Sequence, residues 1–276
     1  MNALAPVLVE RVLAKLGLSD PPGMNLGGLA EIYAAWCRGV PFDNVRKLIH
    51  LHEQIPGPLP GDDAEEFLEA WLAHGTGGTC WAGNGALQAV LASLGFAARR
   101  GYATMLAAPN LPPNHGTVIV AIEGRDFLVD ASILFHEPMS LENGARVDHP
   151  AWGVAMHSED GKLHVRWRPF HMTLECRIES VAATRDDFVG FHEATRSWGP
   201  FNYALSARLN QGDSVIGASF GQHAALDAKG VLSLVESPSA QERTALLVDR
   251  LGISEEMAAR LPPDQPLPPP PKPAMD

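Results

Sequence analysis

The spacing of apolar residues divides the chain into regions with different expected secondary structure. In residues 1–95 the apolar side chains recur every three or four positions, and glycines and prolines separate the segments, which predicts several short helices. In residues 96–185 apolar and polar positions alternate, which predicts strands. The clearest pair, residues 117–122 and 126–131, is joined by Glu123-Gly124-Arg125 and is expected to form a tight hairpin. These patterns predict an α+β protein in which a helical part is followed by a sheet or barrel.

The part of the chain after this sheet, residues 186–261, mixes both patterns. We expect helices over residues 186–197, over residues 239–252 and from Ser254 onward, and strands over residues 215–226 and 230–236. The last segment, residues 262–276, has eight prolines among its 15 residues. Because proline lacks the amide hydrogen that helices and sheets use, we expect this segment to be an extended tail outside the core.

The composition narrows the possible partners. Hydrophobic residues make up 46% of the chain and charged residues 19%, which is typical of a globular protein. The formal net charge of −11 makes nucleic acid and anionic membranes poor partners, and no segment reaches the roughly 20 apolar residues of a membrane span. Three distant cysteines, Cys37, Cys80 and Cys176, are too few for a disulfide framework and indicate a reducing compartment, the cytoplasm.

Cys80 lies where a helix is expected to begin. The run Gly75-Thr76-Gly77-Gly78 permits a tight turn, and after it apolar residues recur with helical spacing as far as Gly95. The unpaired amides and the dipole of a helix N-terminus favour an anion, so Cys80 is a candidate reactive thiolate. The simpler alternative is a small residue that is tolerated at the start of a helix.

A thiolate nucleophile also needs an imidazole to accept its proton and a carboxylate to orient that imidazole. The hairpin offers both, because His115 begins its first strand and Asp130 is near the end of its second strand. In a hairpin that turns at Gly124, these two positions fall nearly opposite each other. Taken singly, His115 could be a solvated histidine at a loop end, and Asp130 could be a carboxylate that caps a turn.

Three segments together resemble the arylamine N-acetyltransferase family. Val40-Pro41-Phe42-Asp43-Asn44-Val45 is similar to its VPFEN[LI] motif, and residues 77–96, GGTCWAGNGALQAVLASLGF, resemble its RGGxCxExN helix. Residues 115–132 resemble the family's hairpin, and the order Cys, His, Asp and the 15-residue separation of His115 from Asp130 match as well. A weaker similarity extends over most of the chain to about residue 260.

The resemblance implies an N-terminal helical bundle (residues 1–95), a central β-barrel (96–185) and a C-terminal α/β lid (186–261), around a core like that of cysteine proteases and transglutaminases. It also implies a Cys80–His115–Asp130 triad that moves an acetyl group from acetyl-coenzyme A to an arylamine, hydrazine or related amine through an acetyl-cysteine intermediate. Acetyl-coenzyme A is thus the expected cosubstrate. Its phosphates would need a basic patch against the overall negative charge.

The chain departs from the family pattern around the triad. Thr76 stands where the family has arginine, Ala82 where it has Glu or Gln, and Ser132-Ile133-Leu134 where it has Gly-Phe-Gly, whereas Asn84 is retained. Two alternatives therefore stay open. One is a related Cys-His-Asp amide synthase or hydrolase with a different acyl donor, and the other is a homologue that binds a ligand without catalysis.

Two further patterns, a possible serine nucleophile motif and possible metal ligands, do not support a second functional site. Gly217-Ala218-Ser219-Phe220-Gly221 matches the G-x-S-x-G nucleophile elbow, but that fold places an acid before the histidine, and here His223 precedes Asp227. A glycine-bracketed turn is the better interpretation. His50 and His52 alternate as on a strand, and no CxxC motif or His-Glu helix pair occurs, so no metal site is expected.

Overall fold

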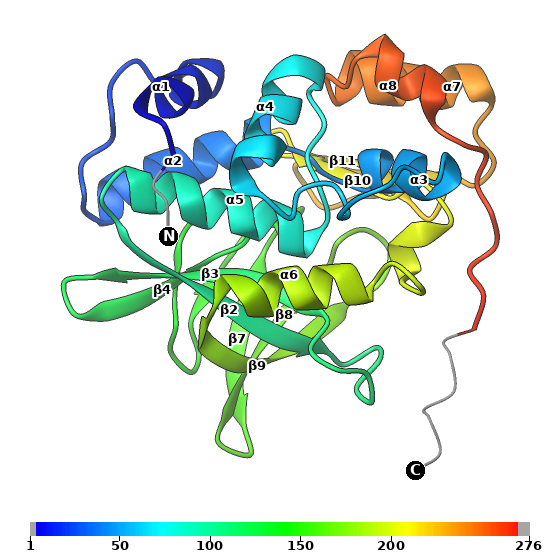
Figure 1. Ribbon diagram of the computed structural model, residues 1–276. Coiled ribbons are helices and arrows are strands. Elements are labelled where there is room, and N and C mark those ends of the chain that lie inside the picture. Colours follow the sequence, from blue (N-terminus) through cyan, green and yellow to red (C-terminus); the bar gives the residue numbers. More distant parts are fainter. Residues whose placement is uncertain (1–3, 270–276) are drawn as a thin grey trace.

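The computed structural model describes residues 4–269, which form a mixed α+β fold as predicted (Figure 1). The described helices are α1 (Pro6–Lys15), α2 (Leu26–Gly39), α3 (Val45–His52), α4 (Ala64–His74), α5 (Cys80–Ser93), α6 (Arg185–Ala194), α7 (Ala240–Ala245) and α8 (Glu255–Arg260), with a 3₁₀ turn (Pro200–Asn202) and a π-helical turn (Leu246–Arg250). The strands are β1 (Phe42–Asp43), β2 (Ala97–Met105), β3 (His115–Ile122), β4 (Arg125–Val129), β5 (Met139–Ser140), β6 (Arg146–Val147), β7 (Val154–Glu159), β8 (Lys162–Trp167), β9 (Leu174–Ala183), β10 (Ala207–Asn210), β11 (Val215–Ser219), β12 (Gln222–Leu226) and β13 (Leu232–Val235).

Local sequence signals set the ends of helix α4, which precedes the helix that carries the candidate nucleophile. Asp63 caps α4 by accepting hydrogen bonds from the amides of Glu65 and Glu66, and Gly75 ends it in the left-handed conformation. The next helix, α5, begins at Cys80, as the sequence predicted. Its side chains are buried on nearly all sides, and it contacts α4, α6, β2 and β3 (Figure 1). A helix of this kind is a central core helix, which gives Cys80 a fixed support.

An antiparallel sheet of eight strands follows, in the order β5-β4-β3-β2-β9-β8-β7-β6. Its two edge strands, β5 and β6, contact each other, so the sheet curls almost into a barrel. The expected hairpin is present: Ile122 pairs with Arg125, and Glu123 and Gly124 form a two-residue turn with φ of 50° and 78°. Strand β4 ends at Val129, so Asp130 lies one residue beyond it rather than within it.

A second antiparallel sheet has the order β1-β10-β11-β12-β13 and lies beside α3 (Figure 1). Its edge strand β1 comes from the N-terminal part of the chain, with Phe42 opposite Arg208 and Asp43 opposite Ala207. The sequence did not predict this strand, because two residues are too few to show an alternating pattern. The pairing joins the segment before α3 to the C-terminal third of the chain.

Three expectations of secondary structure were wrong or incomplete. His50 and His52 lie on helix α3, where Val45, Leu48 and Ile49 form the buried side. Residues 215–226 are not one strand but the hairpin of β11 and β12, because Phe220 and Gly221 turn the chain with positive φ. The same turn explains the G-x-S-x-G match. The helix expected over residues 239–252 is divided into α7 and a π-helical turn.

The proline-rich segment forms neither helix nor strand over residues 262–269, and most of it is exposed, as expected of a tail. It is nevertheless held by side chains: Asp264 accepts hydrogen bonds from the Leu205 amide (2.7 Å) and from Arg243 (3.0 Å), and Trp198 donates to the Pro268 carbonyl. Residues 270–276 of the expected tail lie outside the described residues. Within residues 4–269, none of the helices combines the length and the apolar character that a membrane crossing requires.

Candidate active site

The loop before Cys80 is held by Asp43, from the motif that resembles VPFEN. One Asp43 oxygen accepts a hydrogen bond from the Gly77 amide (2.6 Å), and the other accepts one from the Val45 amide at the start of α3 (2.9 Å). Burial raises the pKa of Asp43 to about 6, although both amides oppose this rise. A side chain at position 77 would put its Cβ 1.7 Å from the Pro41 carbonyl oxygen, so only glycine fits this loop.

Asn44 ties the same motif to the C-terminal third of the chain. Its amide nitrogen donates to the carbonyl oxygens of Phe201 (3.0 Å) and Ala204 (2.8 Å), and its oxygen accepts from the Ser206 amide (2.9 Å). The Asp43-Asn44 dipeptide therefore fixes the nucleophile loop on one side and residues 201–206 on the other. These roles explain why an acid and an amide stand next to each other here.

The structure brings the three predicted residues together. His115 Nε2 lies 2.8 Å from Asp130 Oδ2, which leaves the other ring nitrogen for Cys80, whose side chain contributes to the raised pKa of His115. The Cys80 Sγ also lies 3.9 Å from the carbonyl oxygen of Asn114, the residue before His115. All three side chains are buried, with residue exposures of 6% for Cys80, 5% for His115 and 0% for Asp130. The sequence-based pairing of positions 115 and 130 is thus present as a hydrogen bond.

The His115–Asp130 pair is an ion pair. Burial lowers the pKa of His115, but the charge and the hydrogen bond of Asp130, with a contribution from Cys80, outweigh burial and raise that pKa above its ordinary value. Burial raises the pKa of Asp130, but His115 and the hydrogen bonds from Ser132 and Ile133 hold it well below its usual range. Asp130 therefore favours the cationic form of His115.

Asn84, the residue that the family pattern retains, connects three elements behind the pair. Its amide nitrogen donates to the carbonyl oxygens of Cys80 (3.1 Å) and Gly116 (2.7 Å), and it lies 3.3 Å from Asp130 Oδ1. Its side-chain oxygen accepts from the Ala131 amide (2.9 Å). Asn84 thereby fixes the start of α5 against the start of β3 and the end of β4, which are the three places that carry the candidate triad.

We expect Asn84→Ala to lower the free energy of unfolding by roughly 2–5 kcal/mol, because the buried Gly116 carbonyl and Ala131 amide would lose their partner. Thr76→Val is the matched control. The Thr76 hydroxyl is buried and has no hydrogen-bond partner among the described residues, so valine should change stability by less than about 1 kcal/mol. Urea unfolding monitored by circular dichroism measures both variants. Equal destabilisation by the two substitutions would contradict the role given to Asn84.

Sequence reasoning missed three residues that surround Asp130. The Tyr33 hydroxyl donates to the Asp130 carbonyl (2.9 Å) and accepts from the amides of Asp130 and Phe135. Both the hydroxyl and the amide of Ser132 donate to Asp130 Oδ1, at 2.7 and 2.8 Å. Arg208 of β10 is buried and donates to the Ser132 carbonyl. Asp130 at the end of a strand was a signal, since an aspartate side chain in a turn often accepts a hydrogen bond from the backbone amide two residues on, here that of Ser132.

Arg208 brings a positive charge to this carboxylate from far along the chain. Burial lowers the pKa of Arg208 to about 10, and the nearby charge of Asp130 opposes that effect. Lys47 of α3 is a second buried cation near the site: burial lowers its pKa to about 8, the charge of Cys80 opposes this, and its Nζ donates to the Thr195 hydroxyl at 2.7 Å. The arginine expected before the nucleophile is absent, since Thr76 replaces it, but two other cations lie near the site.

Aromatic side chains cover the start of α5. Trp81 packs edge to face against Phe188 of α6 with centroids 5.1 Å apart, and it stacks against Phe191 of the same helix. On the other side, Trp167 lies 6.0 Å from the His115 ring. Cys80 forms a small buried cluster with Trp81 and Phe188, apart from the main core. These rings keep bulk water away from the thiol and the imidazole.

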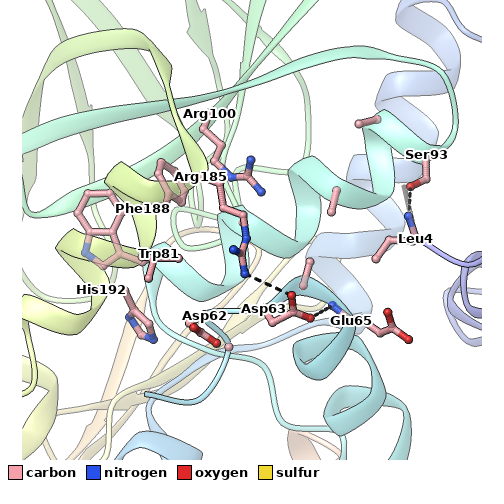
Figure 2. Close-up of a pocket in the computed structure, with 16 residues that line it drawn as sticks. Leu4, Asp62, Asp63, Glu65, Trp81, Ser93, Arg100, Arg185, Phe188 and His192 are labelled. Atoms are coloured by element: carbon pink, nitrogen blue, oxygen red, sulfur yellow. Dashed lines mark hydrogen bonds and ion pairs between the residues drawn. The ribbon is translucent and has the colours of Figure 1, made fainter. Parts of the chain in front are cut away.

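A pocket of about 510 Å³ lies beside this aromatic cluster, between the start of α4, one side of α5, and α6 (Figure 2). Trp81, the neighbour of Cys80, lies on its wall, and Arg185 points toward Asp63, from which it is 3.4 Å distant (Figure 2). Its charged lining comprises two arginines and three carboxylates: Arg100, Arg185, Asp62, Asp63 and Glu65. The pocket is therefore not the basic patch that the sequence led us to expect for coenzyme A.

Comparisons with known proteins identify the family. A family model described as N-acetyltransferase matches residues 25–167, more than half of the chain. The arylamine N-acetyltransferase of Mycolicibacterium smegmatis is 26% identical over 258 residues, which cover 87% of this chain and 90% of that protein.

Solved structures share the fold. The Mycobacterium marinum arylamine N-acetyltransferase in complex with CoA superposes with a TM-score of 0.78 at 19% identity, covering 92% of this chain and 98% of that one. The arylamine N-acetyltransferase of Salmonella typhimurium gives a TM-score of 0.77 at 17% identity, covering 92% and 97%. With its sequence matched over more than half its length and its fold shared almost end to end, the chain belongs to the arylamine N-acetyltransferase family.

Proposed function

We propose that this N-acetyltransferase moves an acetyl group from acetyl-coenzyme A to an arylamine, hydrazine or related amine through an acetyl-Cys80 intermediate. The observation that carries the proposal is the position of His115, with one ring nitrogen on Asp130 and the other available to Cys80. A thiol next to a carboxylate-oriented imidazole is the arrangement of an activated cysteine nucleophile. The names of the relatives, arylamine N-acetyltransferases, and the CoA complex among them support the amine acceptor and the donor.

The reaction has two steps. In the first, the Cys80 thiolate attacks the thioester carbonyl of the donor, the carbon–sulfur bond to coenzyme A breaks, and the coenzyme leaves as a thiol with the proton that His115 held. In the second, the amine nitrogen attacks acetyl-Cys80, His115 accepts a proton from the nitrogen, and the Cys80 thiolate is released. One thioester replaces another in the first step, so that step needs no other energy source. Asp130 keeps the His115 ring in place through both steps.

The surroundings of Cys80 suit the charge that develops in each step. Cys80 is the first residue of α5, so backbone amides at the start of this helix are free of intrahelical partners and can stabilise an oxyanion. The cationic His115 and the nearby Lys47 favour the thiolate electrostatically. A homologue that had lost catalysis would have no need of a buried ion pair in this arrangement, since an unneeded buried ion pair adds little to stability.

The wider organisation belongs to the same proposal. We assign residues 1–95 to a helical bundle that carries Cys80, residues 96–185 to a barrel that carries His115 and Asp130, and residues 186–261 to a lid, around a core like that of cysteine proteases and transglutaminases. The three cysteines are unpaired and buried, which supports a reducing compartment such as the cytoplasm.

Acetyl-coenzyme A added without an acceptor should leave one acetyl group on the wild-type protein, and this adduct should disappear when an arylamine or a hydrazine is added. Intact mass spectrometry measures the adduct, and peptide mapping assigns it to Cys80. Cys80→Ser is the matched variant and should show no adduct. Wild-type protein that stays unmodified by acetyl-coenzyme A but is acylated by another acyl-coenzyme A would contradict the acetyl donor and support a related acyltransferase.

A further inference from the structure

A cluster of metal-binding side chains lies on the sheet, outside the candidate active site. His157 of β7 and His164 of β8 stand directly opposite each other, and Glu175 of β9 and Glu159 at the end of β7 lie beside them. One ligand atom from each of the four residues lies within 4.8 Å of all the others. The neighbouring residues Met156, Val165 and Cys176 belong to the main core, so by the alternation of a strand the cluster is on the opposite face of the sheet.

We propose that His157, His164, Glu175 and Glu159 form a binding site for a divalent transition-metal cation, Zn²⁺ above all. Tetrahedral zinc with bonds of about 2.0–2.1 Å to imidazole nitrogen and carboxylate oxygen keeps its ligand atoms about 3.3–3.4 Å apart. Glu175 Oε1 is 3.1 Å from His164 Nδ1 and 3.6 Å from His157 Nε2, on either side of that separation. The carboxylate oxygen of Glu175 is therefore already close to the required spacing from each imidazole, and all four ligand atoms lie within 4.8 Å of one another.

The surrounding residues position these ligands. Arg166 Nε donates to Glu175 Oε2 at 2.7 Å, which leaves Oε1 directed at the two imidazoles. Hydrogen bonds of this kind orient the carboxylate ligands of metal sites. His164 is almost fully buried, with 5% exposure, whereas the His157 side chain is about one-third exposed, so an ion can enter from the His157 side.

The chemistry of the donors favours zinc over the hard cations. Two imidazoles and carboxylate oxygens suit Zn²⁺ and its neighbours in the periodic table, whereas Ca²⁺ and Mg²⁺ prefer shells made of oxygen alone. The sequence did not predict this site because its members come from three strands, and none of them is part of a short ligand motif. The register of β7, β8 and β9 brings them together.

Calorimetric titration of the full-length, chelator-treated protein with ZnCl₂ tests the site. Because a thiol next to an imidazole can also bind zinc, the titration is run on Cys80→Ser as well as on the wild type. We expect one zinc site to persist in Cys80→Ser and to weaken at least about ten-fold when His157→Ala or His164→Ala is added to it. The control is His52→Ala, because His52 is exposed and lies on helix α3, away from the cluster. When His52→Ala is added to Cys80→Ser, the zinc affinity should equal that of Cys80→Ser alone.

His157 is partly exposed, so His157→Ala keeps the test valid if His164→Ala does not fold. Thermal unfolding gives a second readout: zinc should raise the Tm of Cys80→Ser and should not raise the Tm of the variants in the cluster. Loss of all zinc binding in Cys80→Ser would overturn the proposal, because the metal would then have been held by the candidate active site. Unchanged affinity in both cluster variants would overturn it too.

Discussion

Asp130→Asn is expected to lower kcat/KM for acetyl transfer by about 10⁴-fold, the size of effect that the corresponding substitution has in serine protease triads. The four donors on Oδ1, from Asn84, Ser132 and Ile133, can still bond an asparagine oxygen. The asparagine NH₂ would then replace Oδ2 and donate to His115 Nε2. His115 would have to carry its remaining proton on the nitrogen that faces Cys80, so it could no longer accept the thiol proton.

The same substitution should change the pH dependence of the thiol. In the wild type the charge and the hydrogen bond of Asp130 raise the pKa of His115, which favours an imidazolium next to Cys80. Without that carboxylate, burial dominates and the pKa of His115 falls below its ordinary value. Alkylation of Cys80 by iodoacetamide near neutral pH should then become much slower, and its rate should rise only at higher pH, where the thiol ionises unaided.

Asp126→Asn is the control for both measurements. Asp126 is an aspartate on β4, the strand that ends one residue before Asp130. Its carboxylate is partly exposed and pairs with Arg99, not with His115. The kinetics and the alkylation rate of this variant should match those of the wild type. An Asp130→Asn enzyme that keeps more than about a tenth of the wild-type kcat/KM would show that Asp130 does not control the tautomer of His115.

Gly77→Ala is the second substitution with a large expected effect, and it acts on the structure of the loop. The new Cβ would lie 1.7 Å from the Pro41 carbonyl oxygen, which is backbone and has no side-chain freedom to move away. Relieving the clash requires the loop to shift, and the hydrogen bond from the Gly77 amide to Asp43 would break. We expect a loss of at least about 3 kcal/mol of stability, measured by urea unfolding, together with loss of acetylation at Cys80.

Gly190→Ala provides the comparison for this variant. Gly190 is an exposed helical residue of α6, and a Cβ there would meet nothing within 4 Å. Alanine should stabilise the protein by about 0.5–1 kcal/mol, because glycine loses more backbone entropy in a helix. If Gly77→Ala behaved like Gly190→Ala, the loop before Cys80 would be more adaptable than its contacts indicate.

Local signals were enough to predict the parts of the site that lie close together in sequence. The turn at Gly124 fixes the register of its hairpin, so the approach of His115 to Asp130 could be worked out from residue numbers. The start of α5 at Cys80 followed from the glycine-rich loop and the helical spacing after it. Both predictions depend on contacts within about 20 residues of chain.

The residues that were missed act across long separations. Arg208 reaches the Asp130 region because β10 pairs with the two-residue strand β1, which has no pattern of its own. Tyr33 lies on α2 as an ordinary apolar-face residue, and only the packing of that helix brings its hydroxyl to the backbone of Asp130. No periodicity in a single sequence encodes such contacts, since they depend on how elements dock.

The hydrogen bonds of the proline-rich segment have a practical consequence for recombinant work. Truncation after Leu261 removes only the proline-rich segment that the sequence predicts to be an extended tail. It also removes the carboxylate of Asp264, however. The buried Leu205 amide and the guanidinium of Arg243 would then lose the group that they share. Leu205 is adjacent to Ser206, whose amide donates to Asn44, and β10 with Arg208 follows directly. Removal of residues 262–276 would therefore loosen the segment that leads into β10. The C-terminal limit of the folded unit therefore lies after Pro268 and not at the last helix.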